Sequence, residues 1–192
     1  NNFGGFYRTE FYVHAARMCG GNVEAPCVNH SRFLTRIEGK NIWLGLGLIQ
    51  SLEQKCAEKI FIAQREKPFD SLFDFKERVE PGLEQLKLLI QIGAFRFTGQ
   101  SRKALLWEAH AYYGQKKTTT VSTKLFEEQP KSYTLPPLED SWVEIAIDQR
   151  EFLGFSLCSP FDLVAPQDIP NSEVRAKHFK RMLNKSIFIE GY

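Results

Sequence analysis

Short blocks of helical periodicity, interrupted by Pro and Gly, restrict the folds open to this chain of 192 residues. Residues 51–66 contain neither Gly nor Pro, and their apolar side chains recur every three or four positions, as on one face of a helix. Three later blocks share this pattern: residues 71–79, 83–92 and 101–109. Pro68, Pro81-Gly82 and Gly93 separate the blocks, and such residues end helices or turn the chain. The sequence therefore predicts short helices joined by tight turns, in a mainly α-helical fold.

Weaker patterns precede the helical blocks. Glu10 to Cys19 carries apolar residues at helical spacing and runs into two Gly residues, which predicts an N-terminal helix. Alternating apolar residues from Phe33 to Ile37, a turn at 38–41 and the apolar residues 42–44 predict a small two-stranded β-ribbon.

The C-terminal part changes character twice. Residues 115–137 are polar and contain several Pro, as in an exposed linker. Residues 138–155 regain apolar side chains at helical spacing, and Pro160, Pro166 and Pro170 break the chain beyond them. The last residues, 186–192, predict a β-strand.

The composition sets bounds on function without identifying it. Hydrophobic residues make up 43% of the chain, with 16 Phe, which is enough apolar surface for a core. The net charge of +2 is only mildly basic, weaker than in most strong nucleic-acid binders. No apolar stretch approaches the ~20 residues that span a bilayer, so no membrane partner is expected. Four scattered Cys without a CxxC pair are typical of free thiols in a reducing compartment, so the expected location is cytoplasmic.

The chain also resembles a known family in stretches spread along nearly its whole length. The stretches are EFYVHAARM at 10–18, PCVNHS at 26–31, IWLGLGLI at 42–49, PFDSLFDF at 68–75, LIQIGAF at 89–95 and EFLGFSL at 151–157. In order and spacing they are similar to the DNA polymerase III alpha subunit, the bacterial C-family replicative polymerase. Because the chain opens at Asn1 without an initiator Met, we expect an internal piece of such a protein.

The resemblance implies five successive parts. They are the C-terminal helix of the fingers domain (1–21), a tandem helix-hairpin-helix domain (22–114), a linker with a clamp-binding-like motif (115–137), a helical lead-in (138–185) and the first strand of a truncated OB domain (186–192). In this family the tandem domain holds the newly made duplex behind the active site. The parent polymerase adds deoxynucleotides with Mg²⁺ in a palm domain that this piece lacks. We therefore expect binding of double-stranded DNA in chromosome replication, without catalysis or a cofactor, and other holoenzyme subunits as partners of the full-length protein.

The second hairpin is the stronger candidate for contact with DNA phosphates. A Gly-containing turn between two helices lets main-chain N–H groups approach phosphate oxygens without reading the bases. The candidate residues are Gly93, Arg96, Gly99, Gln100, Ser101, Arg102 and Lys103. The alternative is that Gly93 to Phe95 only caps a helix, with Phe95 in the core and solvated charges around it.

The first hairpin departs from the family pattern, because Ser51-Leu52-Glu53 replaces the expected Gly-hydrophobic-Gly. Two Gly permit positive φ and close approach of the backbone, whereas Glu53 adds negative charge near a phosphate position. We expect this hairpin to be structural, or to bind DNA weakly. The residues for such weak binding are Gln50, Ser51, Gln54 and Lys55.

The linker holds a candidate for docking to a sliding clamp. Family members carry a motif of Gln, two small or polar residues, an aliphatic residue and Phe, and the matching stretch is Ser122 to Phe126. Leu125 and Phe126 supply the apolar pair, whereas the Gln is missing. The alternative is that this pair packs the linker against the domain.

Other classes of function have weaker support. A protein-interaction module would bind partners through the Phe-rich helices, with clamp docking and little DNA binding of its own. A stand-alone nuclease or glycosylase would need a positioned Asp or Lys, and no such constellation is evident. His14, Cys19, Cys27 and His30 match no compact zinc signature, so satisfied side chains are the preferred interpretation and no metal site is expected.

Overall fold

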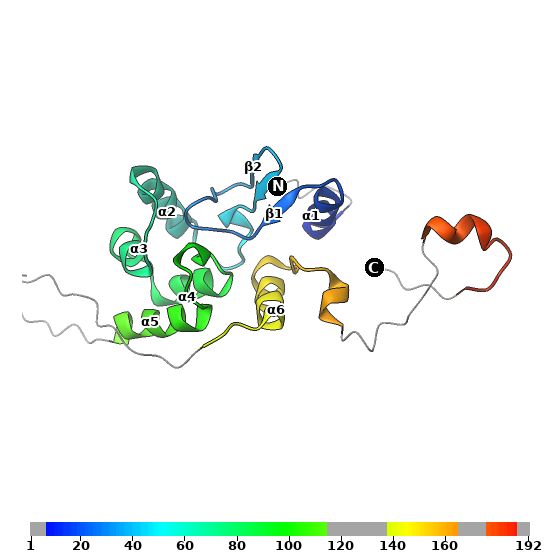
Figure 1. Ribbon diagram of the computed structural model, residues 1–192. Helices are drawn as coiled ribbons and strands as arrows, with labels where there is room; N and C mark the ends of the chain where they lie inside the picture. The colour runs from blue at the N-terminus through cyan, green and yellow to red at the C-terminus, as the bar shows by residue number, and fades with distance from the viewer. Residues whose placement is uncertain (1–6, 115–137, 165–175, 188–192) are drawn as a thin grey trace, which may run out of the picture. The chain divides into compact units, whose positions relative to one another are not determined.

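The helical blocks and the ribbon occur in the computed structural model, which describes residues 7–114, 138–164 and 176–187 (Figure 1). The chain divides into two units, Asn1–Leu157 and Cys158–Tyr192. The described residues of the first unit form six α-helices and one three-stranded sheet. The fold is therefore mainly α-helical with a small β element, as predicted.

The described helices follow the predicted blocks to within a few residues. The α-helices are α1 (Thr9–Met18), α2 (Gln54–Glu66), α3 (Leu72–Val79), α4 (Leu83–Gln91), α5 (Arg102–Gly114) and α6 (Trp142–Leu153). Short 3₁₀ helices lie at η1 (Leu46–Leu48), η2 (Arg96–Thr98), η3 (Pro160–Leu163) and η5 (Ala176–Arg181). Two predicted starts were early: α2 begins three residues after Ser51, which has a left-handed φ of 64°, and α6 begins after Leu138.

Local chemistry explains the ends of α3. Ser71 is its N-cap, and the Ser71 hydroxyl accepts a hydrogen bond from the Asp74 N–H at 3.0 Å. Glu80 closes the helix with a left-handed φ of 48°, and Pro81 follows at once. The predicted stop is confirmed, and Ser is a residue type that favours the N-cap position.

The sheet has one strand more than the predicted ribbon. Strands β2 (Arg36–Glu38) and β3 (Asn41–Trp43) are antiparallel and turn at Gly39, where φ is 60°. β1 (Asn22–Glu24) pairs in parallel with the other edge of β3, giving the order β1-β3-β2. A strand of only three residues leaves no alternating pattern to recognise, so the sequence did not reveal β1.

The core of the first unit gathers between the short helices. Phe75 lies at its centre, with its ring centroid 4.9 Å from both Phe69 and Phe95 in edge-to-face geometry. α4 packs against α5, and α2 packs against α3. Leu86 and Leu89 of α4 are fully buried in the same cluster.

The segment around α6 belongs to this core. α6 contacts α4, and Leu153, Phe155 and Leu157 are buried members of the same apolar cluster. The sequence placed residues 138–185 in a lead-in outside the tandem domain. The boundary between the two compact units follows Leu157, and these side chains pack with the buried residues of α2–α5.

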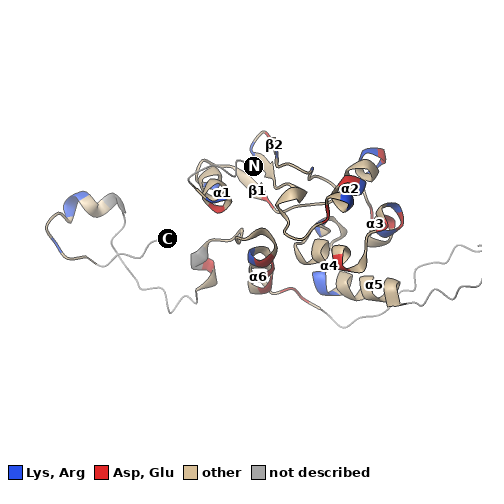
Figure 2. Ribbon diagram, turned by 180° about the vertical axis from the view of Figure 1, so that it is seen from behind, with Lys and Arg blue, Asp and Glu red and all other residues tan. Residues whose placement is uncertain are grey.

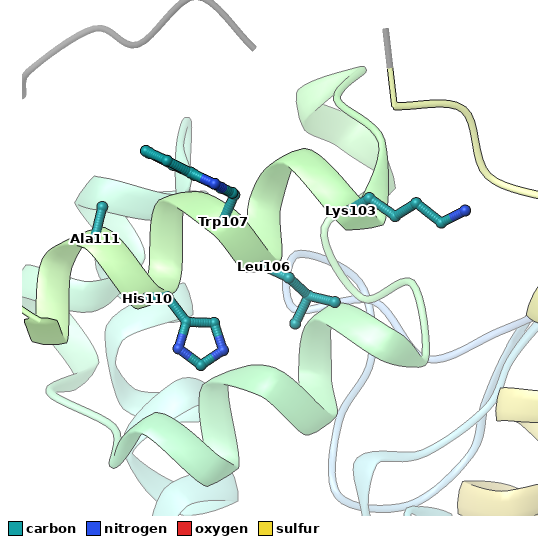
Figure 3. A pocket seen from close by; sticks show the side chains of 5 residues that line it. All are labelled: Lys103, Leu106, Trp107, His110 and Ala111. Carbon is teal, nitrogen blue, oxygen red and sulfur yellow. The ribbon is translucent and has the colours of Figure 1, made fainter. Parts of the chain in front are cut away.

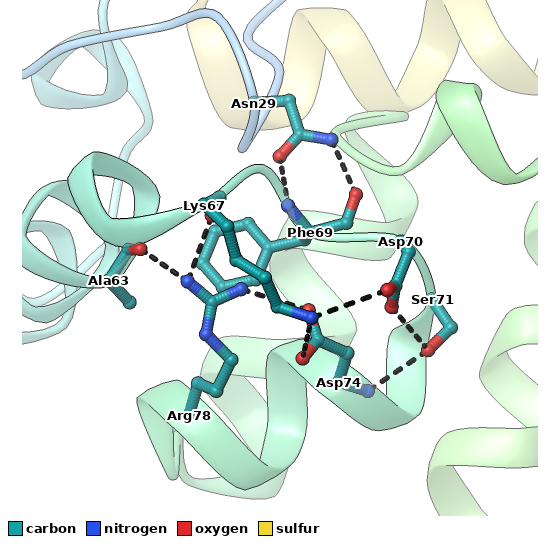
Figure 4. A network of polar contacts seen from close by, with 8 residues as sticks. All are labelled: Asn29, Ala63, Lys67, Phe69, Asp70, Ser71, Asp74 and Arg78. Carbon is teal, nitrogen blue, oxygen red and sulfur yellow. Dashed lines mark hydrogen bonds and ion pairs between the residues drawn. The ribbon is translucent and has the colours of Figure 1, made fainter.

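Arg78 and Asn29 fix the connection between α2 and α3 (Figure 4). Arg78 donates to the carbonyls of Ala63, in the last turn of α2, and Lys67, just after it, and lies 4.5 Å over the ring of Phe69. The Asn29 side chain donates to the Phe69 carbonyl at 2.8 Å and accepts from the Phe69 N–H at 2.7 Å. These contacts satisfy main-chain groups where the helices end.

The described part of the second unit contains η3 and η5. Ser186 and Ile187 have no strand conformation, and the rest of the predicted strand, 188–192, lies outside the described residues. No helix in the described ranges has the length and apolar character needed to cross a membrane.

Candidate functional site

Two turns in the first unit each lead into the start of a helix. The first turn, residues 49–53, joins η1 to α2, and the second, residues 92–101, joins α4 to α5. Ser51 in the first turn has φ 64°, and Gly93 and Gly99 in the second have φ 78° and 69°. Ser51 thus adopts a left-handed conformation that usually favours Gly.

Contacts from α4 and from the end of α6 hold the first hairpin. The Gln85 side chain accepts from the Glu53 N–H at 2.8 Å and donates to the Ser51 carbonyl at 3.1 Å. The Gln50 N–H donates to the Phe152 carbonyl at 2.7 Å. The turn is therefore fixed by elements that lie far from it in sequence.

The N-terminus of α2 is open to solvent. Glu53 is the N-cap, but its side chain makes no capping hydrogen bond. Lys55 is exposed in the first turn of the helix, and Gln54 bonds Glu58 at 2.8 Å. The start of α2 thus presents one cation, one carboxylate and the partial positive charge of a helix N-terminus.

Gly93 and its neighbours cap α4. The Gly93 N–H donates to Ile90 at 2.9 Å, the Ala94 N–H donates to Leu89 at 2.9 Å, and Phe95 is 1% exposed. This C-cap with a core Phe was the alternative interpretation of the second hairpin. These two N–H groups are used within the fold and do not point to a ligand.

Arg96 ties the second turn to the segment after β1. Its guanidinium donates to the carbonyls of Gly93 at 2.7 Å, Ala25 at 2.9 Å and Pro26 at 3.2 Å. It also lies 3.7 Å from a carboxylate oxygen of Glu24. Arg96 is therefore engaged in holding the fold.

Arg102 is buried between α5 and α6, with 9% of its surface exposed. Its Nη1 contacts Asp148 at 2.5 Å and the Gln91 carbonyl at 2.8 Å, and its Nε lies 3.6 Å from Asp140. Burial raises the pKa of Asp148 despite the neighbouring Arg102 charge. The sequence placed Arg102 on the DNA-facing surface, whereas the structure places it inside an ion cluster.

Lys103 stays nearer the surface. Its Nζ lies 2.9 Å from Glu144 of α6, and both side chains are almost half exposed. The hydrogen bond from Lys103 and the Ser141 N–H lowers the pKa of Glu144. Figure 2 shows the basic start of α5 beside α6, which carries acidic residues.

Arg96, Gly99 and Gln100 form the exposed part of the second hairpin, although the Arg96 guanidinium is engaged by main-chain carbonyls. Ser101 follows, and its hydroxyl accepts from the Ala104 N–H at 3.1 Å in the first turn of α5. The structure thus brings the predicted residues of this hairpin together, but only part of the set faces solvent.

Sequence reasoning missed the acidic partners of the second hairpin. Asp140, Glu144 and Asp148 are spaced by four residues and line one face at α6. That spacing is visible in the sequence, but nothing in it says which helix the carboxylates face.

A shallow apolar depression lies along α5 (Figure 3). It is lined by Lys103, Leu106, Trp107, His110 and Ala111. All five side chains come from successive turns of one helix, so the depression offers a ligand no second wall.

The His/Cys set does not converge. Cys27 is buried, Cys19 is exposed, His30 stacks on Trp43 at 4.3 Å, and His14 lies 3.8 Å from Glu10. In the ranges that the structure describes, no three His, Cys, Asp or Glu side chains group so as to hold a metal ion. Leu125 and Phe126, the predicted clamp-binding pair, lie outside those ranges.

Comparison with known proteins finds matches that include the region of both hairpins. Residues 20–105 match the helix-hairpin-helix motif family. An error-prone DNA polymerase of Mycobacterium bovis is 39% identical over 111 residues, which are 56% of this chain and 10% of that protein. DNA polymerase III subunit alpha of Bacillus subtilis is 35% identical over 50% of this chain and 9% of its own length. The corresponding subunit of Staphylococcus epidermidis is 25% identical over 81% of this chain and 15% of its own length.

These matches confirm the resemblance to DNA polymerase III alpha subunits and the presence of a helix-hairpin-helix motif. They extend the resemblance to error-prone DNA polymerases. The chain spans only 9–15% of the length of these relatives.

Proposed function

We propose that this chain, a relative of bacterial DNA polymerase III alpha subunits and error-prone DNA polymerases, binds the phosphate backbone of double-stranded DNA as part of such a polymerase. The observation that carries the proposal is the helix-hairpin-helix match over residues 20–105, on a fold in which two turns with positive φ lead into α2 and α5. Helix starts of this kind bind phosphate oxygens without reading sequence. A polymerase that moves along DNA needs contact of that kind.

The accessible groups favour the first hairpin as the main contact. The start of α2 is open and carries Lys55, whereas Arg96 and Arg102 are engaged in holding the fold. In the second hairpin Gly99 and Gln100 are exposed, but the Gly99 N–H donates to the Arg96 carbonyl and the Gln100 N–H donates to the Thr98 hydroxyl. This assignment reverses the order expected from the sequence alone.

The test is fluorescence anisotropy of a labelled DNA duplex titrated with the chain at low and moderate salt. Lys55→Ala is expected to weaken binding about threefold to tenfold and to reduce the salt slope by about one, because one phosphate contact is lost. The matched control is Lys40→Ala, which removes the same charge from the exposed turn between β2 and β3. Sequence-scrambled duplexes are expected to bind equally well.

Glu53→Lys tests the same hairpin with a change in DNA affinity opposite in direction to that of Lys55→Ala. If the start of α2 faces DNA, this change strengthens binding at low salt, because it replaces a repelling carboxylate by a cation. Equal effects of Lys55→Ala and Lys40→Ala, together with no effect of Glu53→Lys, would remove the first hairpin from the interface. No salt-dependent binding to any duplex would leave the interaction-module alternative.

The remaining expectations concern the whole polymerase. Template-directed synthesis requires a palm domain, so the chain alone is expected neither to extend a primer nor to cleave a labelled duplex with Mg²⁺. Docking to a sliding clamp through Leu125 and Phe126 stays a prediction. Its test is pull-down of the clamp by the wild-type chain and by the Leu125→Ala/Phe126→Ala variant, and equal capture would contradict it.

A further inference from the structure

The N-terminus of α5 is already occupied by an anion of the same chain. The Asp140 carboxylate accepts from the Arg102 main-chain N–H at 2.8 Å and lies 3.6 Å from the Arg102 Nε. A main-chain N–H at a helix start beside a guanidinium is the set of donors that a phosphate diester takes. The start of α2 has no such occupant, since the Glu53 side chain makes no capping bond.

The contact between Asp140 and Arg102 leaves polar atoms of both side chains without hydrogen bonds. Asp140 Oδ1 and Arg102 Nε are buried and have no hydrogen-bond partner among the described residues. Each such group costs about 1–3 kcal/mol relative to a satisfied one. The contact between Asp140 and Arg102 thus leaves hydrogen-bonding capacity on both side chains unused.

The cluster also carries more carboxylates than cations. Asp140, Glu144 and Asp148 face Arg102 and Lys103 across the junction of α5 and α6. A local excess of negative charge weakens the attraction of this hairpin for the DNA phosphate backbone. The Asp140 carboxylate can move away from the cluster, because Asp140 lies before the start of α6. The core contacts of Leu153 and Phe155 hold only the other end of that helix.

We propose that Asp140 occupies the phosphate-binding position at the N-terminus of α5, so that DNA engages the second hairpin only by displacing this carboxylate. The inference rests on the proposed function and deepens it. In the protein without DNA, Asp140 blocks the second hairpin from DNA phosphates. Glu144 reinforces the closed form by pairing with Lys103, the other cation at the start of α5. The first hairpin then makes the initial contact with DNA, and the second hairpin binds a phosphate once Asp140 has moved.

The test compares two neighbouring charge changes, Asp140→Asn and Glu139→Gln. Asparagine keeps an oxygen that accepts from the Arg102 N–H but loses the charge, and Glu139 is exposed beside it. Duplex affinity by anisotropy is expected to rise about fivefold or more for Asp140→Asn and by less than about twofold for Glu139→Gln, because only the former competes for the anion position. The salt slope is expected to steepen by about one for Asp140→Asn, as one phosphate contact is gained.

Glu144→Gln is the second variant, because its ion pair with Lys103 lies near the surface and its loss does not threaten the fold. It is expected to raise affinity more than Glu139→Gln, and it decides the question if thermal melting shows that Asp140→Asn does not fold. Equal gains for Asp140→Asn, Glu144→Gln and Glu139→Gln would overturn the inference while leaving DNA binding intact. Absence of duplex binding by the wild type and all three variants would overturn the proposed function itself. Binding by Asp140→Asn but not by the wild type would support the displacement of Asp140 and would contradict initial contact by the first hairpin.

Discussion

At the scale of single residues, Ser51 shows what a departure from the family pattern does to the backbone. A residue with a Cβ atom at φ 64° is strained relative to Gly, and Ser51 sits there because Gln85, Glu53 and the end of α6 fix the turn. Ser51→Gly is expected to raise the free energy of unfolding by about 1 kcal/mol, since the strain relieved exceeds the extra entropy of the unfolded chain. The measurement is chemical unfolding followed by circular dichroism.

Ser51→Ala is the matched control for this change. It removes the hydroxyl as Gly does but keeps the Cβ atom, so no stabilisation is expected. A gain of equal size in both variants would show that the hydroxyl, rather than the backbone conformation, is unfavourable at this position.

The Cys56 thiol is expected to make the free energy of unfolding fall at high pH. Burial and the nearby Glu53 carboxylate raise the pKa of its thiol to about 11. Below pH 8 the thiol is protonated in both states, so it has no effect on the pH dependence of stability. Between pH 9 and about 11 the unfolded chain loses this proton first, so the free energy of unfolding falls, by an amount on the order of 2 kcal/mol.

The measurement for Cys56 is urea unfolding at pH 8 and at pH 10.5, for the wild type and for Cys56→Ala. The variant lacks the titrating group, so its loss of stability over this interval is expected to be smaller. Iodoacetamide is expected to label the exposed Cys19 faster than the buried Cys56. An identical pH dependence in both proteins would contradict the role given to the Cys56 thiol.

At the scale of elements, the approach of η1 to the loop after residue 31 depends on Gly45. A Cβ atom at this position would lie 2.5 Å from the Phe33 carbonyl oxygen and 2.7 Å from the Thr35 nitrogen, both main-chain atoms. Gly45→Ala is therefore expected to destabilise the fold by about 2–3 kcal/mol, since backbone must shift to make room. The measurement is the midpoint of thermal unfolding.

Gly82→Ala provides the contrast for Gly45→Ala. Gly82 is the N-cap of α4 with φ −66°, and a Cβ atom there would meet nothing within 4 Å. The change is expected to cost less than about 1 kcal/mol, the penalty of a poorer N-cap. If both variants melted at the same temperature, crowding at Gly45 would not control the packing of η1.

The elements that the sequence predicted are those whose signals are local. The apolar stripe of α2 and the stop of α3 before Pro81 need only neighbouring residues, and both were correct. The sequence did not predict β1, because its pairing with β3 joins residues about twenty positions apart. The burial of Arg102 escaped for a similar reason, because its partner Asp148 lies 46 positions away. A cation beside the second hairpin was therefore assigned to DNA, although Asp148 of a distant helix pairs with it.

At the scale of the whole molecule, α6 changes where the folded unit ends. The sequence separated residues 138–185 from the tandem domain on account of the polar stretch before them. The structure puts Leu153, Phe155 and Leu157 into the apolar cluster of α2–α5 and gives Arg102 its carboxylate partners from Asp140 and Asp148. Both the core and the second hairpin therefore depend on α6.

Two truncated chains test this dependence. A chain ending at Leu157 keeps all these contacts and is expected to retain the main thermal transition of the full chain. A chain ending at Gly114 exposes the surface that Leu153, Phe155 and Leu157 cover, at about 1.5–3 kcal/mol for each buried side chain lost. It also leaves Arg102 partly buried without its carboxylates, which adds a further penalty.

The shorter chain is therefore expected to melt at a clearly lower temperature and to bind a hydrophobic dye before it melts. Arg102→Met in the shorter chain separates the two causes, since it removes the unpaired charge while keeping an apolar side chain of similar length. Partial recovery of stability in that variant would assign part of the loss to the ion cluster and the rest to the apolar contacts. Equal melting temperatures for chains ending at Gly114 and at Leu157 would instead mean that α6 rests on a domain that is complete without it.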